Sequence, residues 1–214
     1  MSLIFDRFHR FEHIRSYSAH LSRILEGCIA TDGSGRILHI DEAMNQSVKI
    51  LQEIKSHEKK ALLVGNGGSA AIMAHMQNDL LKADRVKAMV LTETSLLTAL
   101  TNDDGYEVAY SFQVDAWGES NDLLIAVSSS GKSKNILNSV RVAKEKEMYA
   151  ITLSGFSPGN PLREMGDINF FIPSFSYGMV ELSHSILCHY LTDRIAKTQS
   201  VDTQAPRTAI DGSV

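Results

Sequence analysis

The sequence predicts a three-layer α/β/α fold built on a doubly wound sheet of five parallel strands, with further helices at the amino terminus. The main observation is a series of short apolar runs that alternate with helical patterns along most of the chain. The five runs that we interpret as strands span residues 61–64, 86–91, 123–127, 149–153 and 168–172. Strands that are apolar throughout are typical of a parallel sheet covered by helices on both faces. Ligands bind such sheets at the carboxyl ends of the strands, close to the point where the strand order reverses.

The amino-terminal residues carry apolar side chains near helical spacing, which predicts amphipathic helices. The two series are Phe5, Phe8, Phe11 and Ile14, followed by Leu21, Ile24 and Leu25. We therefore assign residues 1–39 to a helical extension in which residues 31–35 form a turn or linker. A helix over residues 41–57 follows, and we expect Asp41 to cap it.

The main domain is expected to span residues 40–197 and to end in a helix over residues 180–197. Its apolar side carries Ile186, Leu187, Tyr190, Leu191 and Ile195. Residues 198–214 contain few apolar side chains, and we expect them to form a flexible tail.

Composition indicates a cytoplasmic protein with one sizeable core. The chain has 214 residues, of which 43% are hydrophobic and 21% charged. The net charge of −4 without a basic cluster argues against a nucleic-acid partner. We expect no membrane association, because no apolar run is long enough to span a bilayer and the first residues lack a signal peptide's apolar stretch. Cys28 and Cys188 stand in apolar, helix-like surroundings, which favours buried thiols over a disulfide.

Two loops follow predicted strands and carry residues suited to binding an anion. The first, Gly-Asn-Gly-Gly-Ser at residues 65–69, lets the backbone approach a ligand and leads into the amino-terminal end of a helix. Alone, it is also compatible with a plain connection. The second, Ser-Ser-Ser-Gly-Lys-Ser at residues 128–133, offers four hydroxyls, whereas capping a helix needs only one. Together the two loops favour a phosphate monoester as ligand.

Two pairs of side chains at helical spacing could carry chemistry. His75 and Asp79 are four residues apart, and Glu181 and His189 are eight residues apart, so each pair shares a helix face. Such pairs can bind a metal or act as acid and base, although spacing alone makes a solvated helix face the simpler interpretation. His184 lies between the second pair, and we expect it to be structural.

The chain resembles the sugar isomerase (SIS) domain family, and within it the phosphoheptose isomerases, over residues from about 40 to about 195. Three motifs carry the resemblance in the family's order: residues 65–69, the Asn-Asp-x-Gly-Tyr-Glu motif at 102–107, and residues 128–133, with Ser129 where threonine is common. The resemblance implies the flavodoxin-like SIS fold. It also implies phosphate binding by Ser128, Ser129, Ser130 and Ser133, and further substrate contacts by Asn66, Gly67, Gly68, Ser69, Asn102, Asp103 and Glu181.

The resemblance further implies a zinc site made by His75, Asp79, Glu181 and His189. Asp79 stands at the position of the family's glutamate base, and Glu181 at the position of a glutamine. All four side chains remain competent zinc ligands. Two other departures concern the substrate: Gly178 stands where an aspartate is usual, and the segment 82–89 is shorter than is usual in the family.

These assignments predict a metal-dependent isomerase that converts sedoheptulose 7-phosphate to D-glycero-D-manno-heptose 7-phosphate through an enediol, with Asp79 as base and His189 as acid. The alternatives are an isomerase of another phosphosugar, or a noncatalytic protein of the same fold that binds phosphosugars or a protein partner, as the replication-initiator-binding relatives do. The family also implies a homotetramer with active sites at subunit interfaces, where His189 could come from a different subunit than His75 and Asp79.

Overall fold

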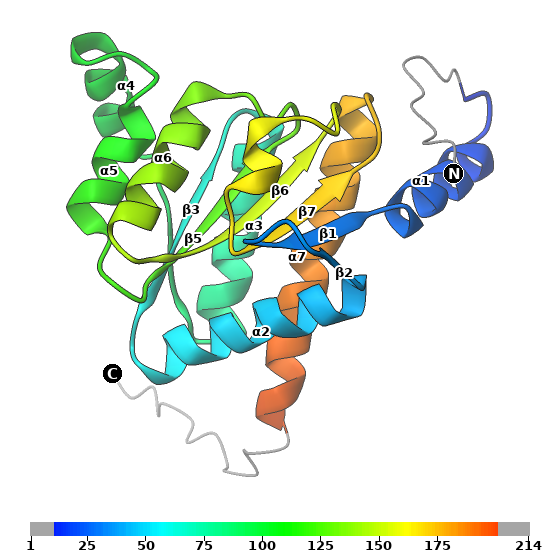
Figure 1. The fold of residues 1–214 in the computed structure, drawn as a ribbon, viewed down its shortest axis with the longest axis horizontal. Coiled ribbons are helices and arrows are strands. Elements are labelled where there is room, and N and C mark those ends of the chain that lie inside the picture. The colour runs from blue at the N-terminus through cyan, green and yellow to red at the C-terminus, as the bar shows by residue number, and fades with distance from the viewer. Residues whose placement is uncertain (1–10, 201–214) are drawn as a thin grey trace, which may run out of the picture.

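The computed structural model describes residues 11–200 and contains all five predicted parallel strands in one sheet (Figure 1). These strands are β3 (Lys60–Gly65), β4 (Lys87–Val90), β5 (Leu123–Ser128), β6 (Tyr149–Gly155) and β7 (Ile168–Ile172). They are hydrogen-bonded in the order β7-β6-β5-β3-β4, and every neighbouring pair is parallel. The predicted α/β class and its parallel sheet are therefore confirmed.

The sheet has two more strands than the sequence predicts. The stretch assigned to a helical extension also contains a hairpin, β1 (Ile29–Asp32) and β2 (Ile37–Leu38), and β1 pairs antiparallel with β7. Only part of the predicted turn or linker at residues 31–35 is a turn, because its first two residues belong to β1. The Asp32 carboxylate closes the turn by accepting hydrogen bonds from the backbone N–H groups of Ser34 and Arg36 (3.0 and 3.1 Å).

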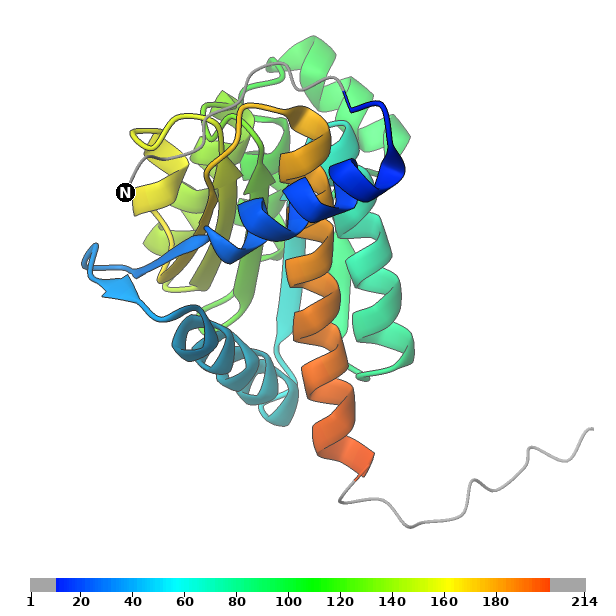
Figure 2. The ribbon, with the colours of Figure 1, turned by 90° about the vertical axis from the view of Figure 1, so that its right-hand side faces the viewer.

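Helices cover both faces of the sheet, as Figures 1 and 2 show. One face carries α1 (Ile14–Glu26), α2 (Ile40–Ser56), α3 (Gly68–Lys82) and α7 (Tyr177–Ser200). The other carries α4 (Thr94–Asp103), α5 (Ala109–Trp117), α6 (Lys134–Glu145) and the short 3-10 helix η1 (Pro161–Glu164). Alternate residues of each central strand supply the two cores. In β5, Ile125 packs on the α3 and α7 side, and Leu124 on the α5 and α6 side.

Helix α2 begins one residue earlier than predicted, and its cap is His39 rather than Asp41. The His39 Nδ1 atom accepts the backbone N–H of Asp41 at 3.3 Å. Asp41 instead lies in the first turn, where a carboxylate is stabilised by the positive end of the helix dipole.

Helix α7 continues to Ser200, beyond its predicted end at residue 197. Phe5, Phe8 and most of the predicted tail lie outside the described residues. Within residues 11–200, none of the helices combines the length and apolar content that crossing a bilayer requires.

The strand order reverses between β3 and β5. From β3 the chain crosses to β4 on one side, and from β5 it proceeds through β6 to β7 on the other. The two glycine- and serine-rich loops follow these two central strands, so both lie at the carboxyl edge of the sheet beside the reversal.

Candidate active site

The loop after β3 depends on glycine at two positions. A Cβ on Gly65 would lie 2.7–3.0 Å from backbone atoms of Ser69 and Ala70, so only glycine allows the strand to meet α3 this closely. Gly67 has φ +54° and forms the cap of α3. These two glycines direct α3 with its amino-terminal end toward the site.

The loop after β5 is organised by its own hydroxyls. Ser128 Oγ lies 3.2 Å from Ser133 Oγ and 3.4 Å from Ser130 Oγ, and it also accepts the backbone N–H of Gly131 (3.2 Å). Gly131 has φ +61°, and a Cβ there would overlap the Asn160 side chain. The loop is therefore fixed in a shape that gathers its serines at the amino-terminal end of α6.

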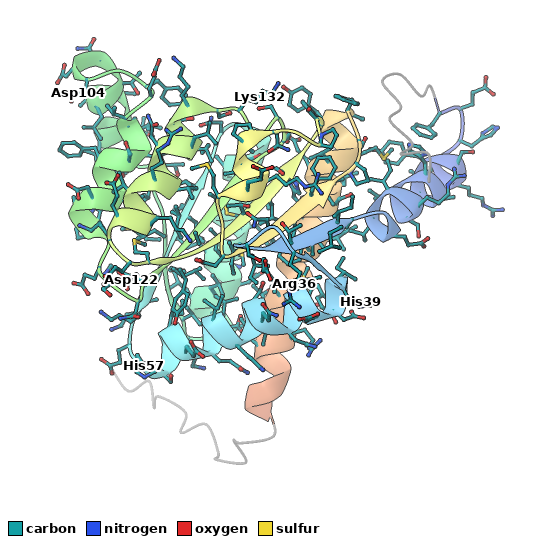
Figure 3. The ribbon with its side chains drawn as sticks, viewed as in Figure 1. Arg36, His39, His57, Asp104, Asp122 and Lys132 are labelled. Atoms are coloured by element: carbon teal, nitrogen blue, oxygen red, sulfur yellow. The ribbon has the colours of Figure 1, made fainter. Side chains whose placement is uncertain are left out.

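A cavity of about 130 Å³ lies between the two loops and the start of α7. Its lining residues are Asn66, Ser69, Ser128, Ser129, Ser130, Ser133, Tyr177 and Glu181. Most of them carry hydroxyl or amide groups, which suit the oxygens of a phosphate monoester. The loop's lysine, Lys132, is exposed at the upper edge of the molecule and does not line this cavity (Figure 3). We call this cavity the serine pocket.

Side-chain amides connect the two loops. Asn66 and Asn135 exchange two hydrogen bonds of 3.0 and 2.9 Å, and the Tyr106 hydroxyl donates to Asn66 Oδ1 at 2.6 Å. Asn135, Tyr106 and Tyr177 are site residues that sequence patterns did not identify. Tyr106 belongs to the 102–107 motif, and that motif could have identified it.

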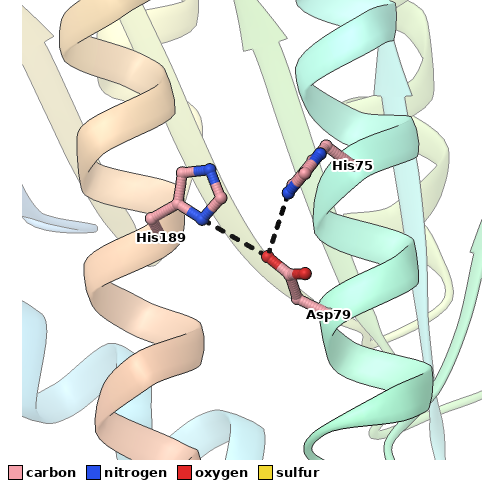
Figure 4. A group of neighbouring side chains, drawn as sticks. All are labelled: His75, Asp79 and His189. Atoms are coloured by element: carbon pink, nitrogen blue, oxygen red, sulfur yellow. Dashed lines mark ion pairs between the residues drawn. The ribbon is translucent and has the colours of Figure 1, made fainter.

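A second group of polar side chains lies on the facing sides of α3 and α7 (Figure 4). Asp79 Oδ2 is 3.6 Å from His75 Nε2 and 3.3 Å from His189 Nδ1, and the two imidazole rings meet edge to face with centroids 4.8 Å apart. One ligand atom from each residue lies within 4.8 Å of the others. The adjoining gap has a volume of about 10 Å³, enough for a single small ligand. We call these residues the His-Asp-His group; all three come from one chain.

Glu181 does not join the His-Asp-His group. Eight residues separate it from His189, which is about 12 Å along the helix axis, so a shared face does not imply a shared site. Its carboxylate lines the serine pocket and packs against Gly68. The structure thus brings together three of the four residues expected to form the metal site.

Asn102 and Asp103 lie at the end of α4, exposed to solvent, and neither lines the serine pocket. Asn102 Nδ2 donates to Asp103 Oδ1 at 2.8 Å. In Figure 3, the neighbouring Asp104 lies at the outer end of α4, well apart from Lys132. Within one chain, these two residues are not brought to the other predicted substrate contacts.

Two buried ionisable groups lie near the site. His184 is fully buried, its Nε2 donates to the carbonyl oxygen of Ser154 (3.2 Å), and burial lowers its pKa to about 4. Burial also raises the pKa of Asp84 to about 6, opposed by Lys55 and reinforced by Asp79. His184 is therefore neutral near pH 7, as a structural histidine is expected to be.

Comparisons with known proteins agree with this fold and its loops. The sequence model of the SIS domain matches residues 19–155. A phosphoheptose isomerase of Helicobacter pylori is 37% identical over 164 residues, covering 74% of this chain and 85% of that protein. A phosphoheptose isomerase of Sulfurimonas denitrificans is 38% identical over 146 residues, covering 65% of this chain and 74% of that protein.

Among solved structures, the phosphoheptose isomerase of Neisseria gonorrhoeae superposes with a TM-score of 0.75 at 28% identity, covering 86% of this chain and 97% of that chain. The motifs, the fold and these relatives agree. The chain belongs to the SIS domain family and, within it, is an enzyme of the phosphoheptose isomerase type.

Proposed function

We propose that this protein converts sedoheptulose 7-phosphate to D-glycero-D-manno-heptose 7-phosphate through an enediol. The observation that carries the proposal is that α3 and α7 together contribute to a serine-lined pocket and to a paired carboxylate and imidazole. The relatives named as phosphoheptose isomerases support the same reaction.

The serine pocket would hold the phosphate. Ser128, Ser129, Ser130 and Ser133 surround it, and the amino-terminal end of α6 adds the positive end of a helix dipole. The opposite wall is formed by Asn66 and Ser69. Gly67 and Gly68 lie between these two residues in the turn that begins α3 and do not line the pocket. A phosphate fixed there would orient the rest of the sugar.

Proton transfer is assigned to Asp79 and His189. Isomerisation requires a base that removes a proton from one carbon and an acid that serves the oxygens. Asp79 has the carboxylate for the first task, and His189, 3.3 Å from it, has a nitrogen that can donate in the second. The Asp79 side chain is one methylene shorter than the family's glutamate. Because α7 packs directly against α3, the Asp79 carboxylate nevertheless reaches His189, and this contact supports its role as base.

The residues present fit a zinc ion. Two imidazoles and a carboxylate form the three-ligand set of many catalytic zinc sites, which keep a further position open. We propose His75, Asp79 and His189 as the ligands. Zinc bound there would supply Lewis acidity to polarise a sugar oxygen.

We further propose that the enzyme acts in the cytoplasm as a homotetramer with active sites at subunit interfaces. The two cysteines are free thiols, as a reducing compartment favours. Exposed apolar side chains on α7 support association, and the exposed positions of Asn102 and Asp103 support a site completed by a second subunit.

Proton NMR in deuterated water tests the reaction directly. Purified protein with zinc is expected to incorporate solvent deuterium into sedoheptulose 7-phosphate and to form the heptose product. Asp79→Asn is expected to lower both rates by roughly 10²- to 10⁴-fold, because it lacks a base. Asp41→Asn, an exposed carboxylate on α2, serves as the matched control and should leave both rates unchanged.

Binding of the sugar phosphate is measured in the same samples. Wild-type protein that binds the sugar but neither exchanges nor converts it would contradict the proposal. That result would favour a noncatalytic phosphosugar-binding protein or an isomerase of another phosphosugar. Full activity in Asp79→Asn would remove Asp79 from the role of base.

A further inference from the structure

Glu181 occupies a position that would otherwise attract an anion. A Cβ built on Gly68 would lie 2.6 Å from both Glu181 carboxylate oxygens, so the carboxylate lies directly against the first residue of α3. The first turn of a helix presents N–H groups without helical partners and the positive end of the dipole. The protein's own carboxylate therefore neutralises one of the two helix ends that face the pocket.

The other helix end is left for the ligand. The start of α6 is bordered by serine hydroxyls, and no acidic side chain lines that side of the pocket. Of the eight lining residues, only Glu181 has a carboxylic acid side chain, and none has a basic one. The pocket thus has one wall suited to an anion and one wall that repels it.

The Glu181 carboxylate has no competing partner in the part of the chain that the structure describes. It makes no hydrogen bond and no ion pair with residues 11–196, and it is only half-buried. Carboxylate oxygens accept hydrogen bonds from hydroxyl groups and repel other anions. Its oxygens are consequently available to a neutral, hydroxylated ligand.

From this geometry we infer that Glu181 is a specificity-determining residue, which restricts the serine pocket to phosphomonoesters whose adjacent carbons carry neutral hydroxyls. A ligand with a second anionic group next to the phosphate is rejected by charge repulsion. The inference rests on the proposed phosphosugar pocket but not on turnover.

Two small probes test this selection. Glycerol 3-phosphate and 3-phosphoglycerate share a three-carbon skeleton and a phosphate, but the first ends in a hydroxymethyl group and the second in a carboxylate. Titration calorimetry with wild-type protein is expected to show at least about tenfold tighter binding of glycerol 3-phosphate. In Glu181→Gln, which keeps the shape and removes the charge, the ratio of the two dissociation constants should fall to about twofold.

Two further variants make the test specific. Glu145→Gln removes an exposed carboxylate at the end of α6 and should keep the wild-type ratio. Gly68→Ala should displace the Glu181 carboxylate and lower the ratio as Glu181→Gln does. Bound zinc is measured in each protein, because unchanged zinc content separates selection by charge from a role as metal ligand.

The outcomes separate this inference from the proposed function. An equal ratio in wild type and Glu181→Gln, or failure of wild type to bind either probe, would overturn the inference. Normal isomerase activity together with an equal ratio would leave the proposed function standing. If the ratio depends on Glu181 but the protein does not turn over sedoheptulose 7-phosphate, the inference about Glu181 stands and the proposed isomerase reaction is wrong.

Discussion

His184 illustrates how burial decides the state of a single residue. The carbonyl oxygen of Ser154 can only accept, so the neutral ring must carry its proton on Nε2. Nδ1 is buried and has no hydrogen-bond partner among the described residues. Sequence spacing predicted a structural role for His184 but could not give its protonation state. Only the packing of α7 on β6 shows that it cannot readily become charged.

Replacement of His184 by glutamine is expected to change how stability depends on pH. The folded-state pKa of about 4 is below the ordinary value of 6.5, so between these values the unfolded chain binds a proton that the folded chain does not. The free energy of unfolding of the wild type should therefore fall, relative to His184→Gln, by roughly 3 kcal/mol as pH decreases from 7 to 4. Urea denaturation at several pH values measures this difference.

The difference in unfolding free energy between wild type and His184→Gln reports the contribution of His184 alone. The raised pKa of Asp84 acts with the opposite sign, because the folded state then holds the proton more tightly, but it is present in both proteins and cancels. Parallel stability curves for wild type and His184→Gln would contradict the prediction.

The amide pair of Asn66 and Asn135 joins the loop after β3 to the first turn of α6. Substitution of either residue by alanine removes both hydrogen bonds of the pair. The remaining asparagine keeps its other partner, the Tyr106 hydroxyl for Asn66 or the N–H of Ile136 for Asn135. We expect a double-mutant cycle with Asn66→Ala and Asn135→Ala to give a coupling free energy of about 1 kcal/mol, measured by denaturant unfolding. KM for the phosphosugar should rise in both single variants. Strictly additive effects would mean that the pair does not couple the loops.

Element prediction succeeded where a pattern was long and failed where it was short. The strand of residues 123–127 is apolar throughout, and the structure places all of it in β5. The hairpin of β1 and β2 was missed because β2 has only two residues and the Asp-Gly-Ser-Gly turn dominates the local pattern. Both central loops could be predicted, because glycines and serines followed apolar strands. The position of Glu181 could not, because a helix face two turns long spans more than one site.

One face of the protein combines the His-Asp-His group with exposed apolar side chains of α7. Leu182, Ile186 and Tyr190 follow each other at four-residue spacing on α7, and each is about 40% exposed. Figure 2 shows α7 and α3 side by side on this face. An apolar stripe of this kind beside polar functional groups is typical of a surface covered by another subunit.

The proposed second copy would also explain the position of Asp103, which does not line the serine pocket of its own chain although the resemblance implies a sugar contact. If a neighbouring subunit presents its Asp103 to the pocket, Asp103→Ala should lower activity strongly without lowering stability, because the side chain is exposed. Asp79→Asn should also be inactive. When the two variants are mixed, unfolded and refolded together, random pairing gives roughly one quarter of the shared sites two intact contributions. Recovery of about a quarter of wild-type activity is therefore expected, measured by NMR of product formation.

Two variants refolded separately and then combined are the control and should remain inactive. Absence of recovery in co-refolded mixtures that sedimentation shows to be mixed oligomers would place each complete site within a single chain.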